Sequence, residues 1–238
     1  MHSYKAFCFD VFGTVVDWRA SVAKQLDQWM LDHDIQGVDA FAFADAWRAQ
    51  YQPAMEACRE GRRPFTRLDV LHRENLETVL AAFKVPIADI SEQALERLNR
   101  VWHRLDPWQD ASAGLYRLKQ QFIIATASNG NIAIMVGLAK HGDLPWDAIL
   151  GAEVTRAYKP LPQAYTQMAA ILGLERREIC MVAAHNDDLH AARAQGLGTA
   201  FVVRPMEFGA QQTTDLTPTQ QWDFIANDFL DLAQQVGC

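Results

Sequence analysis

The sequence predicts an α/β fold: a Rossmann-like parallel sheet core with helices on both faces and an inserted helical cap domain. Short apolar runs recur, as expected of strands buried on both faces, at 4–9, 122–127, 179–184 and 199–203. Helical patterns separate the later runs, as in repeated βα units, at 130–141, 162–172 and 187–195. Between the first two runs lie more than 100 residues without a convincing strand, which indicates an insertion.

The insertion consists of amphipathic helical patterns at 22–33, 41–58, 66–83 and 91–105. In the third pattern, Thr66 and Asp69 resemble a capping box ahead of apolar residues at helical spacing. Aromatic, Pro and Asp residues interrupt the patterns at 16–21 and 107–110, which we interpret as linkers. We therefore expect a catalytic core formed by residues 1–18 and 107–238 and a cap formed by residues 19–106.

Composition narrows the class of protein. Half of the 238 residues are hydrophobic and 21% are charged, which supports a well-buried globular core. The formal net charge of −7 disfavours nucleic acid and anionic lipid as partners, so local cations must hold any anionic substrate. The four cysteines show no paired spacing, which fits free thiols. Without a signal-peptide pattern or an apolar stretch of ~20 residues, we expect a soluble, cytoplasmic protein.

Polar side chains follow the predicted strands. Asp10 follows the first run, Ser128 and Asn129 follow the second, Lys159 follows the next β-region, and Asp188 follows the run at 179–184. Taken singly, each residue could have an ordinary structural role as a turn cap, a helix N-cap or a solvated surface charge. Because ligands of such sheets bind outside the carboxyl ends of the strands, the set together predicts a site at this edge.

These strand-end segments resemble the four motifs of the haloacid dehalogenase superfamily, whose members share a Rossmann-like core and an Asp nucleophile. Most members are magnesium-dependent phosphatases. This chain departs from them twice: Phe12 stands where the phosphatases carry a second Asp, and Ala183 and Ala184 stand where they carry the metal-holding Gly-Asp pair. A hard cation needs several oxygen ligands. We therefore expect no metal and no other cofactor.

Residues 9–19 resemble, more narrowly, the L-2-haloacid dehalogenase (type II) branch. The resemblance implies that Asp10 displaces halide from C2 of a short 2-haloacid, either an L-2-haloacid or haloacetate. Water then hydrolyses the Asp10 ester and releases a 2-hydroxyacid. It also implies that Thr14 holds the carboxylate, that Lys159 favours its ionised form, and that Arg48 from the cap stabilises the departing halide.

The same resemblance implies the substrate-binding residues. Ser128, with N–H groups at the start of the next helix, would hold the substrate carboxylate, and Asn129 would lie opposite the cap arginine. Aromatic side chains would exclude water. The substrate-binding set expected from the resemblance is Phe12, Trp47, Ser128, Asn129, Tyr165 and His185.

The fourth motif differs from the pattern of many members of the branch, which carry serine and asparagine where this chain has Ala183 and His185. His185 could donate to the departing halide, shape a smaller pocket, or be an ordinary hydrogen-bonded histidine. Asp188 could orient or activate the hydrolytic water, or it could be an electrostatic partner of Lys159.

Two other functions remain open from the sequence. One is a phosphatase or another phosphoryl-transfer activity of the superfamily. The other is a catalytically silent relative that binds a small anion or a protein. For the dehalogenase, the expected partners are the small-molecule haloacid and halide, without nucleic acid or membrane, and a homodimer is possible.

Overall fold

The computed structural model describes residues 4–88 and 90–238 and contains a six-stranded sheet in which every strand pairs in parallel. The strand order is β3-β2-β1-β4-β5-β6. The strands are β1 (Ala6–Phe9), β2 (Ile123–Ser128), β3 (Ala148–Gly151), β4 (Ile179–Ala183), β5 (Gly198–Val202) and β6 (Phe224–Ala226). The fold class predicted from the sequence is confirmed.

Side chains of the central strand alternate between two layers, as the two-residue period of a strand requires. Phe7 and Phe9 of β1 pack in one apolar cluster, whereas Ala6 and Cys8 pack in the other. The first layer contains α6 (Ala111–Lys119), α7 (Ile132–His141) and α11 (Phe229–Gln235). The second contains α9 (Pro162–Leu172) and α10 (Asn186–Ala194), with α8 (Ala152–Thr155) and η2 (Arg176–Glu178) nearby in the chain.

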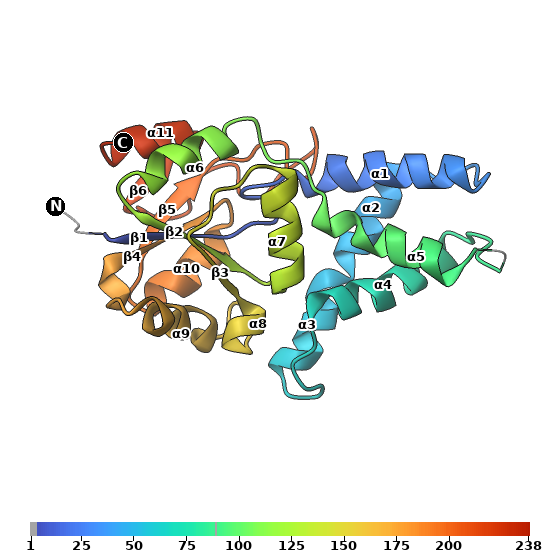
Figure 1. Ribbon diagram of the computed structural model, residues 1–238, viewed down its shortest axis with the longest axis horizontal. Coiled ribbons are helices and arrows are strands. Elements are labelled where there is room, and N and C mark those ends of the chain that lie inside the picture. Colours follow the sequence, from blue (N-terminus) through green and yellow to red (C-terminus); the bar gives the residue numbers. More distant parts are fainter. Residues whose placement is uncertain (1–3, 89) are drawn as a thin grey trace.

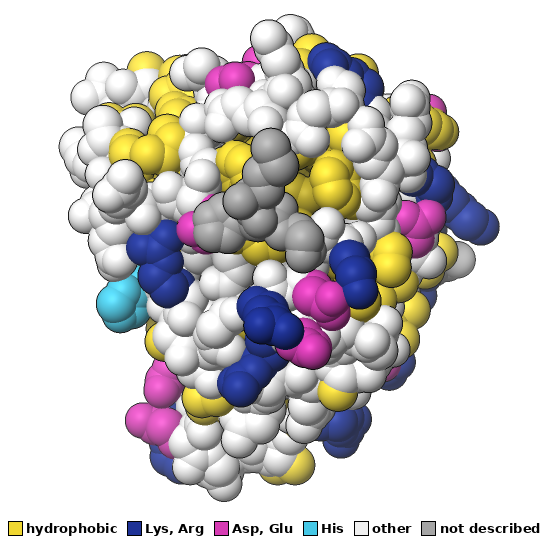
Figure 2. Space-filling model, turned by 90° about the vertical axis from the view of Figure 1, so that its left-hand side faces the viewer, with side chains coloured by type: hydrophobic (Ala, Val, Ile, Leu, Met, Phe, Trp, Pro, Cys, Tyr) yellow, Lys and Arg dark blue, Asp and Glu magenta, His cyan; other side chains and the backbone are white. Residues whose placement is uncertain are grey.

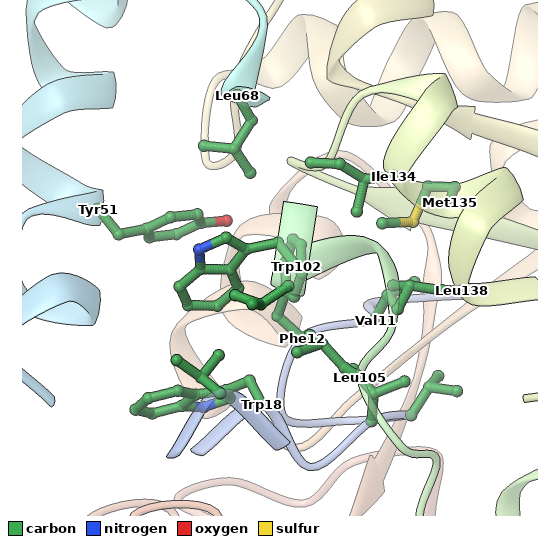
Figure 3. Close-up of a cluster of buried hydrophobic side chains, with 14 of the residues drawn as sticks. Val11, Phe12, Trp18, Tyr51, Leu68, Trp102, Leu105, Ile134, Met135 and Leu138 are labelled. Carbon is green, nitrogen blue, oxygen red and sulfur yellow. The ribbon is translucent and has the colours of Figure 1, made fainter. Parts of the chain in front are cut away.

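The long insertion is helical, as predicted, and lies beside the sheet beyond α7 (Figure 1). Its elements are α1 (Trp18–Asp32), α2 (Ala40–Ala49), α3 (Tyr51–Arg59), α4 (Leu68–Ala82), α5 (Glu92–Asn99) and η1 (Arg100–His103). Apolar side chains from both parts meet in one cluster, where Trp18 and Trp102 lie near Phe12, Ile134 and Met135 (Figure 3). This contact holds the insertion over the edge of the sheet that carries the strand ends.

The two connections between core and insertion run side by side. Val16 forms a β-bridge with Pro107, Asp17 N–H donates to Asp106 O at 2.9 Å, and Trp108 N–H donates to Val15 O at 3.0 Å. The predicted linker at 16–21 is wrong from Trp18 onward, because α1 already begins at that residue. Asp17 caps that helix by accepting from Ala20 N–H at 3.0 Å. The boundaries at residues 19 and 106 stay predictions.

Several helix predictions also need correction. The segment at 41–58 forms two helices, since Pro53 lacks an N–H and can only sit in the first turn of a new helix. The segment at 91–105 ends in the 3₁₀ turn η1. The capping box at Thr66 does not form: its hydroxyl donates to Pro64 O, and the Asp69 N–H donates to Asn131 Oδ1 of the core. Asp69 thus joins the insertion to the core instead of closing its own helix.

Three further features can be compared with the expectations from composition: the cysteines, the helices and the surface charges. Cys8, Cys58, Cys180 and Cys238 are free thiols. Within residues 4–88 and 90–238, no helix has the length and apolar character needed to cross a membrane. On the face of the core away from the helical insertion, acidic and basic side chains lie interspersed (Figure 2).

Candidate active site

The carboxyl ends of the strands face the insertion across a cleft of about 970 Å³. The core contributes the segments after β1, β2, β3, β4 and β5, and the insertion contributes α1, α2 and α3. Most of the predicted site residues line this cleft: Asp10, Phe12, Arg48, Asn129, Lys159, Tyr165, His185 and Asp188. The parallel topology explains this convergence, because it brings every strand end to one edge of the sheet.

Asp10 is 7% exposed and lies at the centre of a dense set of donors. Lys159 Nζ donates to its Oδ1 at 2.8 Å, and the Thr14 hydroxyl donates to its Oδ2 at 2.8 Å. His185 Nδ1 lies 3.2 Å from the same Oδ2. The hydrogen bond expected from Thr14 is therefore present. Its hydroxyl also accepts from Ala184 N–H at 2.9 Å, which fixes its orientation.

These contacts keep Asp10 ionised. Burial alone raises the pKa of a carboxyl group, but the ammonium of Lys159 and the imidazole of His185 outweigh burial and hold the pKa of Asp10 well below its usual value. A carboxylate that stays charged in a largely buried site is available as a nucleophile without prior loss of a proton.

Lys159 is shared by two carboxylates. Its Nζ contacts Asp188 Oδ2 as well as Asp10, and the second oxygen of Asp188 accepts from the Tyr165 hydroxyl at 2.7 Å. Burial lowers the pKa of Lys159, but the two carboxylates more than offset this and raise it. For Asp188, burial and the neighbouring Asp10 outweigh the lysine, and its pKa is raised. Asn129 orients the lysine by accepting from its backbone N–H at 2.8 Å.

His185 connects Asp10 to an acid that the sequence analysis did not identify. Its Nε2 lies 2.9 Å from Oε2 of Glu207, which follows β5 and is 1% exposed. Burial lowers the pKa of His185, but Glu207 and Asp10 raise it well above its usual value. The position of Glu207 after another strand end was the signal that could have revealed it.

Arg48 brings a cation from the insertion to the cleft. Its guanidinium lies over the ring of Tyr51, 4.0 Å from the centroid, and 5.4 Å from the ring of Trp18. Among the described residues, its buried Nη1 has no hydrogen-bond partner. Phe12 lies close by and contacts Tyr51 and Trp102 edge-on. An anion in the cleft would therefore meet the charged guanidinium of Arg48 among aromatic side chains.

Trp47 and Ser128 are not among the residues that line the cleft. Trp47 is buried inside the insertion, where its Nε1 donates to His72 O at 3.0 Å, and it does not line the cleft. Ser128 is 1% exposed, and its hydroxyl accepts from Gly130 N–H at 3.0 Å. At the start of α7, Ile132 N–H donates to Glu153 Oε2 at 2.8 Å. The N–H groups of Gly130 and Ile132 are thus used within the protein, and the substrate contact of Ser128 stays a prediction.

The cleft does not fit a divalent cation of the phosphatase type. Lys159 Nζ lies between Asp10 and Asp188, the two carboxylates that would ligate such an ion, and donates to both. Nowhere in the described chain do three or more His, Cys, Asp or Glu side chains form a group able to hold a metal. The fixed positive charge of the lysine therefore takes the place that a cation would need.

Comparison with known proteins agrees with this geometry. Residues 4–196 match the haloacid dehalogenase-like hydrolases, and the chain belongs to that family. The similar solved structures narrow the class further. A defluorinating L-2-haloacid dehalogenase is 47% identical, with a TM-score of 0.97 over 99% of this chain and 96% of that chain. A second L-2-haloacid dehalogenase is 44% identical, with a TM-score of 0.92 over 98% of both chains.

Among curated proteins, the (S)-2-haloacid dehalogenase 4A of Burkholderia cepacia is 27% identical over 205 residues. That match covers 85% of this chain and 84% of the relative. The haloacetate dehalogenase H-2 of Moraxella sp. (strain B) is 24% identical over 208 residues, or 86% of this chain and 88% of the relative.

Proposed function

We propose that this protein hydrolyses short 2-haloacids, L-2-haloacids or haloacetate, to 2-hydroxyacids and halide through an ester of Asp10, without a metal or another cofactor. The observation that carries the proposal is the Asp10 carboxylate, held ionised by Lys159 at 2.8 Å within a cleft that also contains Arg48. A nucleophilic anion and a separate cationic group for a leaving anion are the two requirements of displacement at carbon.

In the first step an oxygen of Asp10 attacks C2 of the substrate as the carbon–halogen bond breaks in line. The products are halide and an ester with inverted configuration at C2. Arg48 receives the halide, because its buried Nη1 has no hydrogen-bond partner among the described residues and its charge persists inside a closed cleft. Phe12 and Tyr51 limit the access of water to the reacting carbon.

The substrate carboxylate binds beside Lys159 and Asn129. An ammonium has three N–H donors, and Asp10 and Asp188 use two of those of Lys159. The third is available to an oxyanion in the cleft. Asn129 also lines the cleft, and it holds Lys159 in place by accepting from its backbone N–H. In the second step, water attacks the Asp10 carboxyl carbon and releases the 2-hydroxyacid.

One relative that is 47% identical is described as defluorinating, so fluoroacetate belongs in the substrate panel. We also propose a homodimer, a cytoplasmic location, and a division of the chain into a core and a cap of residues 19–106.

The test is halide release from L- and D-2-chloropropionate, chloroacetate and fluoroacetate, with and without EDTA. We expect turnover of the L enantiomer and of at least one haloacetate, no effect of EDTA, and no hydrolysis of 4-nitrophenyl phosphate. Phosphate release that EDTA abolishes, without halide release, would reject the proposal in favour of a phosphatase.

A further inference from the structure

Glu207 is a buried acid that the displacement step does not use. Both of its oxygens have partners: Oε1 accepts from Trp18 Nε1 at 3.0 Å, and Oε2 lies 2.9 Å from His185 Nε2. A Cβ at Gly13 would lie 2.1 Å from Oε1, so the turn after β1 packs directly against this carboxylate. Burying a carboxylate is costly unless it is paired, and here the structure holds it in one fixed position.

The other nitrogen of the same imidazole faces the reaction. Nδ1 of His185 lies 3.2 Å from Asp10 Oδ2, and the His185 side chain is 22% exposed in the cleft, where water can reach it. Asp188 is less suited to take a proton. One of its oxygens accepts from Lys159 and the other from the Tyr165 hydroxyl.

We propose that His185, oriented by Glu207, is the general base that activates water for hydrolysis of the Asp10 ester. Glu207 is the positioning residue: by accepting from Nε2–H it fixes the tautomer whose lone pair is on Nδ1. This inference rests on the proposed function, since it assigns a role in its second step.

The charge of Asp10 controls when His185 can act as a base. In the resting enzyme the imidazole faces two carboxylates, which raise its pKa well above the usual value and favour a proton on each nitrogen. Ester formation neutralises Asp10 and removes one of these anions. The imidazolium then loses its Nδ1 proton to solvent, which is the one acid equivalent released in each turnover.

Hydrolysis restores the resting state. The oxygen of water bonds to Cγ of Asp10 as one of its protons passes to Nδ1 of His185. The bond between Cγ and the substrate oxygen then breaks, and that oxygen takes the second proton and leaves as the hydroxyl of the 2-hydroxyacid. Asp10 is again a carboxylate, and His185 is again an imidazolium.

Ester formation removes the ion pair between Lys159 and Asp10, but Lys159 keeps its second carboxylate, Asp188. From α2, Asp45 is paired with Arg19, and Arg48 lies over Tyr51. In the same cleft are Asp187 of α10 and Asp215, which accepts from Asn186. Of the two carboxylates that contact His185, ester formation therefore changes the charge of Asp10 and leaves that of Glu207.

His185→Asn tests the assignment, because asparagine can still donate to Asp10 but cannot accept a proton from water. We expect a burst of one halide per active site, followed by turnover slower by ~10²–10⁴-fold. Mass spectrometry of the peptide with Asp10 should show accumulated ester. His141→Asn is the matched control, since His141 is partly exposed on α7 and pairs with Asp106.

Two results with His185→Asn would overturn the proposal. One is hydrolysis of the ester at the wild-type rate. The other is a folded variant that shows no halide burst, which would place His185 in the first step. A wild-type enzyme that releases no halide from any haloacid would instead reject the proposed function itself.

Glu207→Gln tests the positioning role separately. The negative charge of Glu207 raises the pKa of His185, and a base works only when it is unprotonated. Removing the charge should therefore lower the pKa of His185, so that the acidic limb of the pH profile for ester hydrolysis moves to lower pH. The maximal rate of ester hydrolysis should also fall, while the halide burst stays complete. A merely structural residue would not shift this limb. An unchanged acidic limb would exclude Glu207 from the role.

Discussion

The Lys159 ammonium donates to Asp10 Oδ1 at 2.8 Å and also contacts Asp188. One fixed cation thus joins the loop after β1, the loop before α9 and the first turn of α10. Because Lys159 and His185 both stabilise the negative charge of Asp10, the nucleophile stays ionised in a buried site.

Lys159→Met should change the pH dependence of halide release. In the wild type, the lysine and His185 hold the pKa of Asp10 below its usual value, so Asp10 stays reactive as the pH falls past that value. Without the lysine, burial and the neighbouring Asp188 raise the pKa of Asp10, and the acidic limb moves to higher pH.

We also expect the plateau rate of Lys159→Met to fall by roughly 10²-fold. Single-turnover halide release measured across pH reports both effects. An acidic limb at the wild-type position would contradict the role assigned to the lysine.

Asp10→Asn should abolish halide release, since an amide oxygen is a far weaker nucleophile than a carboxylate. We expect a loss of ~10⁴-fold or more, as for other essential nucleophiles. Asparagine has nearly the shape of aspartate, and its one amide oxygen can still accept from either Thr14 or Lys159, so the fold should persist. Circular dichroism checks the fold, and halide release near the wild-type rate would exclude Asp10 as the nucleophile.

Arg48→Lys keeps the charge but loses the planar group that lies over Tyr51, 4.0 Å from its centroid. If Arg48 stabilises the departing halide, the rate of the displacement step should fall by roughly 10²-fold. Arg62→Lys is the matched control, because Arg62 is an exposed arginine of the insertion paired with Glu60. Single-turnover rates for chloride and bromide substrates measure the effect, and equal rates in both variants would remove Arg48 from the reaction.

Gly13→Ala should disturb the Glu207 carboxylate. Gly13 has a φ of +84°, and its added Cβ would lie 2.1 Å from Glu207 Oε1. Gly61→Ala is a control for backbone strain alone, because Gly61 has a φ of +72° and nothing within 4 Å of the added Cβ.

Both alanines should lower the free energy of unfolding by about 1–2 kcal/mol through strain. Only Gly13→Ala should also slow hydrolysis of the Asp10 ester. Urea unfolding and single-turnover kinetics separate the two effects. Equal kinetics in the two variants would show that the contact with Glu207 does not matter.

Much of the fold and part of the site could be predicted from the sequence. Strands buried on both faces form continuous apolar runs, and a parallel sheet places the residues that follow them at one edge; Asp10, Lys159 and Asp188 were found in this way. The strand β6 was missed because it is short and lies at the edge of the sheet, with exposed Ile225. Such a strand lacks the apolar signal.

The other features of the site could not be predicted, because they depend on tertiary contacts that the order of residues along the chain does not show. The Ser128 hydroxyl follows a strand end like the others, but it turns back to its own loop at Gly130. Trp47 directly precedes Arg48 in the chain, yet helical geometry directs it into the interior of the insertion. Glu207 lies four residues beyond the predicted strand at 199–203, and only the folded chain shows that it meets His185.

The most direct test of the central claim is a single turnover of excess enzyme with L-2-chloropropionate in ¹⁸O-labelled water. Attack of water on the Asp10 ester puts the label into the Asp10 carboxylate and leaves the first D-lactate unlabelled. Mass spectrometry of the peptide with Asp10 and of the product measures both. Label in the first product and none in Asp10 would show that water displaces halide directly, and would contradict covalent catalysis by Asp10.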